Sequence, residues 1–146
     1  MIIIGSDHAG FSLKEKLKKY LNKRKISFID IGAYSLKKND DYPDYAEKLA
    51  KAVASNKKNK GILVCATGTG MVIAANKVKG ARAVNAYDLH TARMSRLDND
   101  ANILCLRGKG FPFEKTKRIV SVWLNTKFSG KARHKRRLEK ISKLEK

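Results

Sequence analysis

Short apolar runs alternate with amphipathic segments along the whole chain. The first run, MIIIG at 1–5, is apolar without clean alternation, which is typical of a strand covered on both faces of a sheet. The segment 11–24 then has Leu13, Leu17 and Leu21 at helical spacing, with lysines on the opposite face. Read in this way, the pattern predicts strands over 1–5, 27–32, 61–66, 81–86 and 102–106, and helices over 11–24, 41–56, 70–80, 88–97, 113–128 and 134–146.

The predicted strands and helices follow one another in strict alternation. This order is typical of βαβ units, a parallel sheet and helices on both faces of that sheet. The 146 residues contain no internal repeat and no linker, so we expect a single domain over 1–146. The apolar start is too short for a signal peptide and no run approaches membrane-spanning length, so the sequence favours a cytoplasmic protein.

Charge changes this picture mainly at the carboxyl end. The formal net charge is +20, and basic residues are dense over 127–146. Leu138, Ile141 and Leu144 recur there at helical spacing, so we expect a basic helix packed on the domain or at a subunit interface. Such a charge favours an anionic partner, either nucleic acid or a small phosphorylated ligand. The simpler explanation is lysine on solvent-exposed faces, because aromatic residues do not interleave with the basic runs.

Three polar stretches follow predicted strands, at the ends where parallel sheets bind ligands. The first, after the first strand, presents Asp7 and His8, and Asp7 either contacts a ligand or caps the next helix. The second, CATGTGM, begins with Cys65. The third, DLHTARMSRLDNDAN, ends just before the fifth strand.

The stretch CATGTGM combines a thiol with a Gly-rich turn. Gly68 and Gly70 permit a tight turn whose N–H groups point inward at a helix start, where a phosphate or an oxyanion is stabilised. The same field favours a thiolate, so Cys65 is either a base or nucleophile, or a small core residue. Neither a P-loop nor a dinucleotide fingerprint is complete here. Cys105, inside a predicted strand, is interpreted as a packing residue, and both thiols are expected to be reduced.

The basic tail contains a possible phosphate site. Arg133 and Arg137 are four residues apart and share one helical face. Two guanidinium forks on one face suit a phosphate, whereas an ordinary solvated charge run is the alternative.

Several motifs occur in one order over almost the whole chain: GSDHAGF, DYPDYA, CATGTGMVIAANKVKGARA, TARMSR-x-x-NDAN and RHKRR. Together they resemble the type B ribose-5-phosphate isomerases and the related galactose-6-phosphate isomerase subunits. The resemblance implies a Rossmann-like α/β fold, a three-layer α/β/α sandwich around a five-stranded parallel sheet. It also implies a homodimer or a dimer of dimers with active sites shared between subunits. The implied reaction is aldose–ketose isomerisation of a sugar phosphate, with no metal and no organic cofactor.

The resemblance assigns a role to each matching residue. Cys65 becomes the base that moves a proton between adjacent carbons, and Thr67 lies at the centre of the loop that holds the enediolate oxygens. The remaining assigned positions are the loop residues Ala66, Gly68, Thr69 and Gly70, the sugar- and phosphate-contacting Asp7, His8, Tyr42, Asn99 and Lys109, and the phosphate clamp Arg133 and Arg137.

Three positions depart from the family pattern. Asp98 stands where the family commonly has a histidine that helps to open the sugar ring, and a carboxylate can exchange protons in its place. Lys109 stands where arginine is usual, and Ala66 replaces a glycine. His90 is no simple substitute for the missing imidazole, because eight residues of helix separate it from Asp98 by roughly 12 Å.

Three functional hypotheses remain open. The leading one is isomerisation between ribose 5-phosphate and ribulose 5-phosphate. The second is a hexose-6-phosphate isomerase of the galactose or allose type, or one subunit of such an enzyme. The third, from a different class, is a basic nucleic-acid-binding protein.

Overall fold

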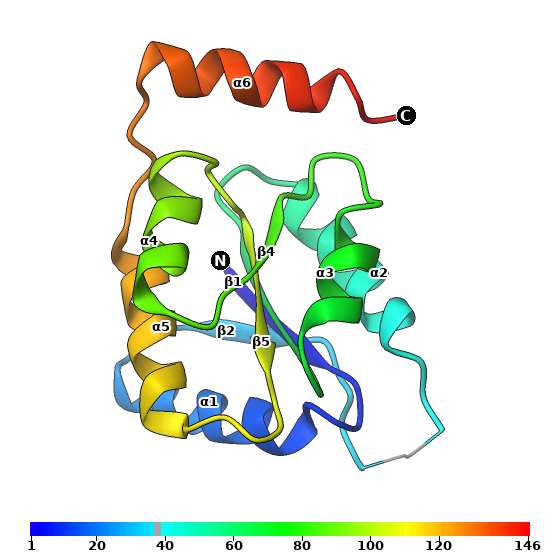
Figure 1. Ribbon diagram of the computed structural model, residues 1–146. Coiled ribbons are helices and arrows are strands. Elements are labelled where there is room, and N and C mark those ends of the chain that lie inside the picture. Colours follow the sequence, from blue (N-terminus) through cyan, green and yellow to red (C-terminus); the bar gives the residue numbers. More distant parts are fainter. Residues whose placement is uncertain (37–38) are drawn as a thin grey trace.

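The computed structural model describes residues 1–36 and 39–146, in which one five-stranded sheet is flanked by helices (Figure 1). All strands are parallel, in the order β2-β1-β3-β5-β4, which confirms the expected α/β, Rossmann-like fold. The strands are β1 (Ile2–Ser6), β2 (Phe28–Asp30), β3 (Lys60–Cys65), β4 (Ala83–Asn85) and β5 (Ile103–Arg107); the helices are α1 (Phe11–Lys23), α2 (Tyr42–Ala54), α3 (Thr69–Ala75), α4 (Leu89–Leu97), α5 (Phe113–Asn125) and α6 (Ala132–Ser142).

Two apolar clusters cover the two faces of the sheet. On β3, Ile62 and Val64 join a cluster with α1, α4 and α5, whereas Leu63 and Cys65 join a cluster with α2 and α3. This division follows from the strand period of two, which sends successive side chains to opposite faces. Because both faces are covered, β3 is apolar throughout its buried length, as its sequence predicted.

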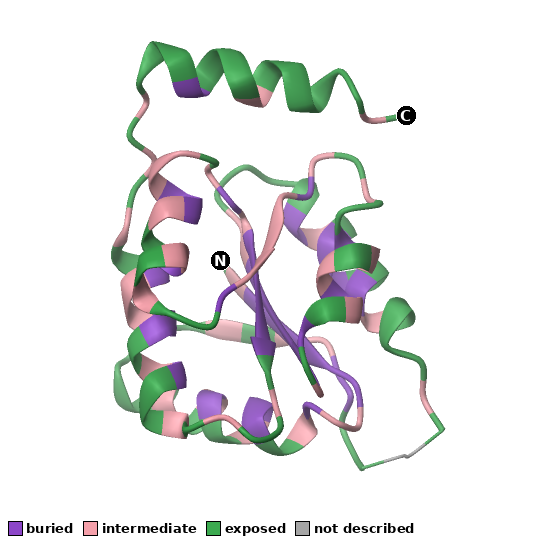
Figure 2. Cartoon of the chain, in the orientation of Figure 1, coloured by how far each residue is buried: buried purple, intermediate pink, exposed green. Residues whose placement is uncertain are grey.

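Helix α6 lies outside these layers. It crosses the end of the sheet from which the strand arrows point away (Figure 1), and most of its surface is exposed (Figure 2). Its one buried residue is His134. The apolar Ile141 of α6 and Leu144 just after it are 44% and 79% exposed, so α6 and its end have an apolar face that the protomer itself does not cover.

The amphipathic pattern of α1 needs one correction. Leu13, Leu17 and Leu21 are buried as predicted, but Lys14 is also fully buried and not on the solvent face. Its Nζ donates to both carboxylate oxygens of Asp30 at 2.7 and 2.8 Å and to a backbone carbonyl. A buried ammonium needs such partners, and these come from β2, which the helical spacing alone does not reveal.

Several element ends also differ from the prediction. The strand predicted to reach residue 32 ends at Asp30, because Gly32 turns over the end of β1 with φ +101° and its carbonyl accepts the N–H of Ser6. The helix predicted to reach residue 80 ends at Ala75, since the amide of Asn76 bonds both backbone groups of Ala83 and leads the chain into β4. Long-range backbone contacts therefore decide these ends.

Among the described residues, no helix has both the length and the apolar character needed to cross a bilayer.

Candidate functional site

Cys65 is the last residue of β3, at the carboxyl ends of the strands. It is buried, with 5% of its surface exposed, and belongs to the apolar cluster that contains Leu63 and Met71. Its Sγ also accepts a hydrogen bond from the backbone N–H of Gly68 at 3.0 Å. The residue is therefore packed in the core, and its sulfur accepts one backbone hydrogen bond from the Gly-rich loop.

The loop 66–70 turns tightly next to this sulfur. Gly68 has φ +88°, and a Cβ there would lie 2.7 Å from Oδ1 of Asn85, so both the backbone conformation and the space require glycine. The hydroxyl of Tyr87 donates to the carbonyl of Thr67 at 2.8 Å. These contacts hold the loop against the end of β4.

Ala66, the departure from the family glycine, is accommodated without strain. Among the described residues, the non-glycine positions with positive φ are Lys25 and Asp100, so Ala66 has an ordinary backbone conformation. Its carbonyl accepts the N–H of Lys109 at 3.2 Å, which joins the loop to the end of β5.

Asp7 follows β1 and is buried beside the same edge. Its Oδ1 accepts the N–H of Gly10 at 2.9 Å, immediately before α1 begins. Burial raises the pKa of the Asp7 carboxyl above its ordinary value, and the hydrogen bond from Gly10 only partly offsets this. Asp7 is therefore not the N-cap residue of α1, which is Gly10; its carboxylate stabilises the turn before that helix and retains a perturbed acidity.

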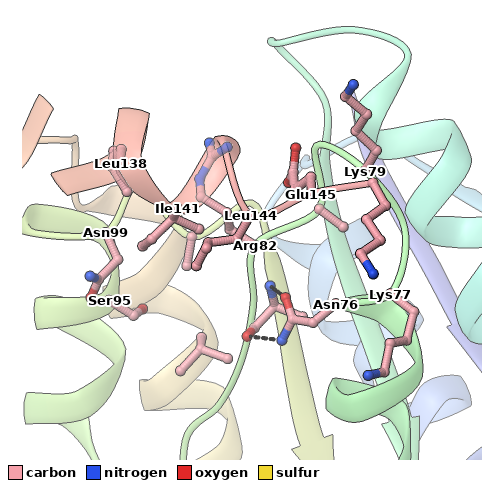
Figure 3. A pocket seen from close by; sticks show the side chains of 15 residues that line it. Asn76, Lys77, Lys79, Arg82, Ser95, Asn99, Leu138, Ile141, Leu144 and Glu145 are labelled. Atoms are coloured by element: carbon pink, nitrogen blue, oxygen red, sulfur yellow. Dashed lines mark hydrogen bonds between the residues drawn. The ribbon is translucent and has the colours of Figure 1, made fainter. Parts of the chain in front are cut away.

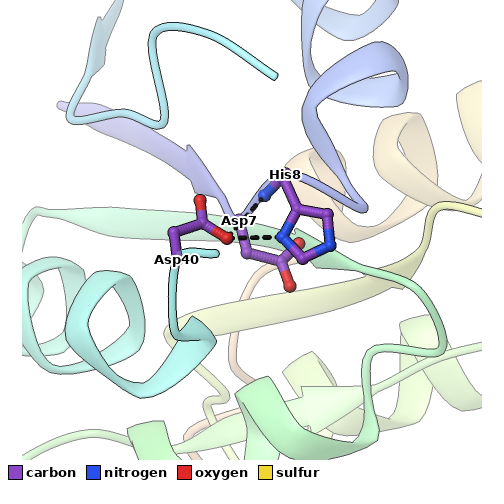
Figure 4. A group of neighbouring side chains, drawn as sticks. All are labelled: Asp7, His8 and Asp40. Carbon is purple, nitrogen blue, oxygen red and sulfur yellow. Dashed lines mark hydrogen bonds and ion pairs between the residues drawn. The ribbon is translucent and has the colours of Figure 1, made fainter. Parts of the chain in front are cut away.

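His8 is half-buried and pairs with a residue that the sequence analysis missed (Figure 4). Oδ1 of Asp40 accepts the His8 backbone N–H at 3.2 Å and contacts the ring Nδ1. Burial acts to raise the pKa of Asp40, but the hydrogen bonds from His8 and Tyr45 outweigh it, so this pKa lies below its ordinary value. The pair fixes the orientation of the imidazole at the edge of the sheet.

Asp7, His8 and Asp40 each offer one possible metal-ligand atom, and these atoms lie within 4.8 Å of one another. Nδ1 of His8 already faces Asp40, however, and Oδ1 of Asp7 already accepts a backbone N–H. The geometry is therefore that of a hydrogen-bonded group and not of an open ligand set.

Tyr42, the first residue of α2, lies against the Gly-rich loop. A Cβ on Gly70 would be 2.6 Å from Cζ of Tyr42, so the ring packs directly on that glycine. The exposed Lys109 lies beyond β5 at the same edge, and its carbonyl accepts the Nε of Arg107 at 2.7 Å. Arg107, which the sequence analysis did not select, thus adds a guanidinium here. We call the predicted residues at this edge the carboxyl-edge group: Asp7, His8, Tyr42, Cys65, residues 66–70 and Lys109.

The other four predicted residues lie elsewhere. The third polar stretch begins at the carboxyl edge with Asp88, but the nine residues of α4 then run back along the sheet for about 13 Å. Asp98 and Asn99 consequently lie at the amino ends of the strands, which corrects the expectation that this whole stretch faces the ligand edge. Arg133 and Arg137 are exposed on α6, across this same end (Figure 1). These four residues are called the amino-edge group.

A cavity of about 720 Å³ lies between α6 and the body of the protein at this end (Figure 3). Asn99 lines it from the turn after α4, Leu138 and Ile141 line it from α6, and Leu144 lines it from just beyond α6. The salt bridge between Asp98 Oδ1 and Nε2 of the buried His134, 3.2 Å apart, joins the two helices beside it.

Two residues that the sequence analysis missed support this geometry. Asp40 is 32 residues from His8, and His134 is 36 residues from Asp98, so no local spacing links either pair. The acidic run before Pro43 and the histidine inside RHKRR were visible, but only the fold identifies their partners.

Comparison with known sequences gives a consistent result. A family model described as Ribose/Galactose Isomerase matches residues 2–141. A probable ribose-5-phosphate isomerase B of Mycoplasma pneumoniae is 43% identical over 140 residues, 96% of this chain and 91% of the relative. A D-erythrulose-4-phosphate isomerase of Mycolicibacterium smegmatis is 40% identical over 129 residues, 87% of this chain and 85% of the relative.

Solved structures agree over nearly the whole chain. A ribose 5-phosphate isomerase of Thermotoga maritima has a TM-score of 0.92 at 46% identity and covers 97% of both chains. The ribose-5-phosphate isomerase B of Mycoplasma genitalium, solved with bound ribulose-5-phosphate, has a TM-score of 0.93 at 38% identity, covering 98% of this chain and 94% of that one.

Proposed function

The chain belongs to the ribose/galactose isomerase family of sugar-phosphate isomerases, and we propose that it interconverts ribose 5-phosphate and ribulose 5-phosphate with Cys65 as the base. The observation that carries the substrate assignment is near-full-length similarity to ribose-5-phosphate isomerases, one of them solved with ribulose-5-phosphate bound. The reaction needs only proton transfers, and each role below falls to a residue of this chain.

Isomerisation transfers one proton between adjacent carbons. The Cys65 thiolate takes the proton from C2 of the open aldose and an enediolate forms. The thiol then returns the proton to C1, while the proton of the C2 hydroxyl passes to O1. At the start, the Gly68 N–H donates to the sulfur. Once protonated, the sulfur is a weaker acceptor, so that N–H becomes free to stabilise the new charge on oxygen. The burial of Cys65 supports this role, because a base in a dry site is not competing with bulk water.

The rest of the site comes from a second copy of the chain. The amino-edge group lies at the opposite end of the sheet from Cys65, so one protomer cannot place both groups on one sugar. In a dimer with twofold symmetry, the amino-edge group of each copy meets the carboxyl-edge group of the other, which produces two identical sites. Arg133 and Arg137 then hold the phosphate, and Asn99 contacts the sugar. The uncovered apolar face of α6 supports such an interface, in a homodimer or a dimer of dimers.

Substrate length is the main alternative within the enzyme class. Asp98 replaces the ring-opening histidine, and one relative at 40% identity acts on a four-carbon ketose phosphate. A hexose 6-phosphate remains the other candidate from the resemblance. Initial rates with ribose 5-phosphate, allose 6-phosphate, galactose 6-phosphate and erythrose 4-phosphate decide between them. We expect the highest kcat/KM with ribose 5-phosphate, and a clear preference for another chain length would overturn the assignment.

The role of Cys65 is tested by comparing the two cysteines. Cys65→Ala should lower kcat by about 10²–10⁴-fold, the range for loss of a general base. Cys105→Ala is the matched control: this thiol is fully buried, and burial raises its pKa so far that it stays protonated. We expect the control to keep turnover near wild type. Near-wild-type turnover of Cys65→Ala would remove the proposed base.

A further inference from the structure

Asp98 and His134 form a close pair on two different helices. Asp98 directly follows α4, and its Oδ1 lies 3.2 Å from Nε2 of His134 in the first turn of α6. The imidazole is buried, with 7% of its side chain exposed, whereas the Asp98 side chain is 36% exposed. The carboxyl group therefore has one side toward an imidazole and another open to the surroundings.

The junction between the two helices is fixed by other contacts as well. The N–H of Ser129 donates to the carbonyl of Leu97 at 3.1 Å, and Nε of Arg96 donates to the carbonyl of Thr126 at 3.2 Å. These bonds hold the segment before α6 against the end of α4. The imidazole is thus placed beside Asp98 by the fold and does not depend on the salt bridge alone.

We propose that Asp98 and His134 act as one acid–base pair that opens the sugar ring, with Asp98 contacting the ring oxygen and His134 as the positioning residue that exchanges the proton through Oδ1. This inference rests on the proposed function, including the meeting of Asp98 with the partner copy's substrate. A lone carboxyl group exchanges protons near pH 4, whereas an imidazole does so near neutral pH. The pair therefore supplies an imidazole to the ring-opening site, although position 98 itself is an aspartate.

In this step the pair loses and regains the same number of protons. The one transferable proton of the pair, on the His134 imidazolium in the salt bridge, passes through Oδ1 of Asp98 to the ring oxygen as the bond between that oxygen and C1 breaks. The hydroxyl on C1 loses one proton as the carbonyl forms, and the pair takes it up. Ring opening therefore leaves both side chains in their starting state, with no other reactant.

The location of His134 fits this role. It lies between Arg133 and Arg137 on α6, next to the proposed phosphate clamp. In a pentose 5-phosphate the ring oxygen is close to the phosphate along the carbon chain. The two arginines on one helical turn, and the Asp98 carboxyl group next to them, can thus reach neighbouring parts of one substrate.

The first test replaces the imidazole and then restores one at the other position. His134→Gln should lower kcat for ribose 5-phosphate by about 10²-fold, the lower range for loss of acid–base assistance, with KM nearly unchanged. Adding Asp98→His to this variant should recover most of the activity. His90→Gln, a change at an exposed histidine of α4 outside the site, is the matched control and should behave as wild type.

A second substrate isolates the ring-opening step. Erythrose 4-phosphate cannot form a five-membered ring, because the phosphate occupies the required oxygen. His134→Gln should therefore lower turnover of ribose 5-phosphate but not that of erythrose 4-phosphate. Equal losses on both substrates, or no recovery with Asp98→His in a folded dimer, would overturn the inference.

The two proposals fail in different ways. If the wild-type protein isomerises no sugar phosphate, the proposed function is wrong and this inference falls with it. If wild type and Cys65→Ala differ as expected but His134→Gln keeps full turnover, only the role of the Asp98–His134 pair is wrong.

Discussion

Gly10 lies where the chain has no room for a side chain. A Cβ at this position would be 2.2 Å from the carbonyl oxygen of Val64 and 2.4 Å from its carbonyl carbon, both backbone atoms of β3. Because β3 is the central strand, these atoms cannot move without disturbing the sheet. Gly10 thus allows α1 to begin directly beside the strand that carries Cys65.

We therefore expect Gly10→Ala to lower the free energy of unfolding by about 3 kcal/mol or more, because the overlap is with backbone. Urea denaturation measures it. Gly130→Ala is the control: φ is +68°, but the nearest neighbouring atom, Cε of Lys135, is 4.0 Å from the added Cβ, so only the left-handed conformation costs about 1–2 kcal/mol. Equal losses for the two variants would show that the close approach at Gly10 is unimportant.

For single residues, local sequence patterns predict some of the contacts in the candidate site. Cys65 and Gly68 are adjacent to a strand–turn–helix pattern, and the structure brings them into contact. His8 was selected, but its partner Asp40 was not, because the contact spans 32 residues. Local patterns identify residues within one turn, whereas pairs made by the fold need the arrangement of whole elements.

Among the elements, α1 and β2 are joined by a buried charge network. Asp30 accepts hydrogen bonds from Lys14 and from the N–H of Gly32, and it forms a salt bridge with Lys18. Burial acts to raise the pKa of Asp30, but Lys14, Lys18 and Gly32 outweigh it, so the pKa lies below its ordinary value. The network therefore stabilises the fold only while Asp30 is ionised.

This gives a pH dependence with a definite sign. A carboxyl whose pKa is lower in the folded state adds stability above its unfolded pKa, about 4, and this stability is lost as pH falls through the folded value. Asp30→Asn should therefore be less stable than wild type at neutral pH, and the difference should shrink below about pH 4. Denaturation across pH measures this. A difference that stays constant or widens with acidification would contradict the assigned role.

Strand–helix order was predictable, but several element ends were not. The alternation of apolar runs and amphipathic segments is local, so it survives without knowledge of the fold. Asn76 ends α3 through bonds to Ala83, and Lys14 is buried through bonds to Asp30. Both depend on neighbouring strands, which the one-dimensional pattern does not place.

Two features belong to the whole molecule: the net charge of +20, and the distance between the carboxyl-edge group and the amino-edge group. They support different functional hypotheses. The charge is spread over exposed helix faces, and together with the arginine-rich tail it supports the nucleic-acid hypothesis. The separation concerns particular residues. Cys65 lies at the carboxyl ends of the strands, whereas Arg133 and Arg137 lie on α6, the helix that crosses the amino ends (Figure 1). The proposed site, which combines both groups, would therefore require two chains.

The most direct test of this claim mixes two inactive variants. Cys65→Ala lacks the base, and the double variant Arg133→Gln, Arg137→Gln lacks the phosphate clamp. In a mixed dimer, one of the two sites combines an intact Cys65 from one copy with intact arginines from the other. Random pairing should thus restore about a quarter of the wild-type activity. If mixed dimers form, as a tag on each variant would show, and the mixture stays as inactive as its components, the shared site is contradicted.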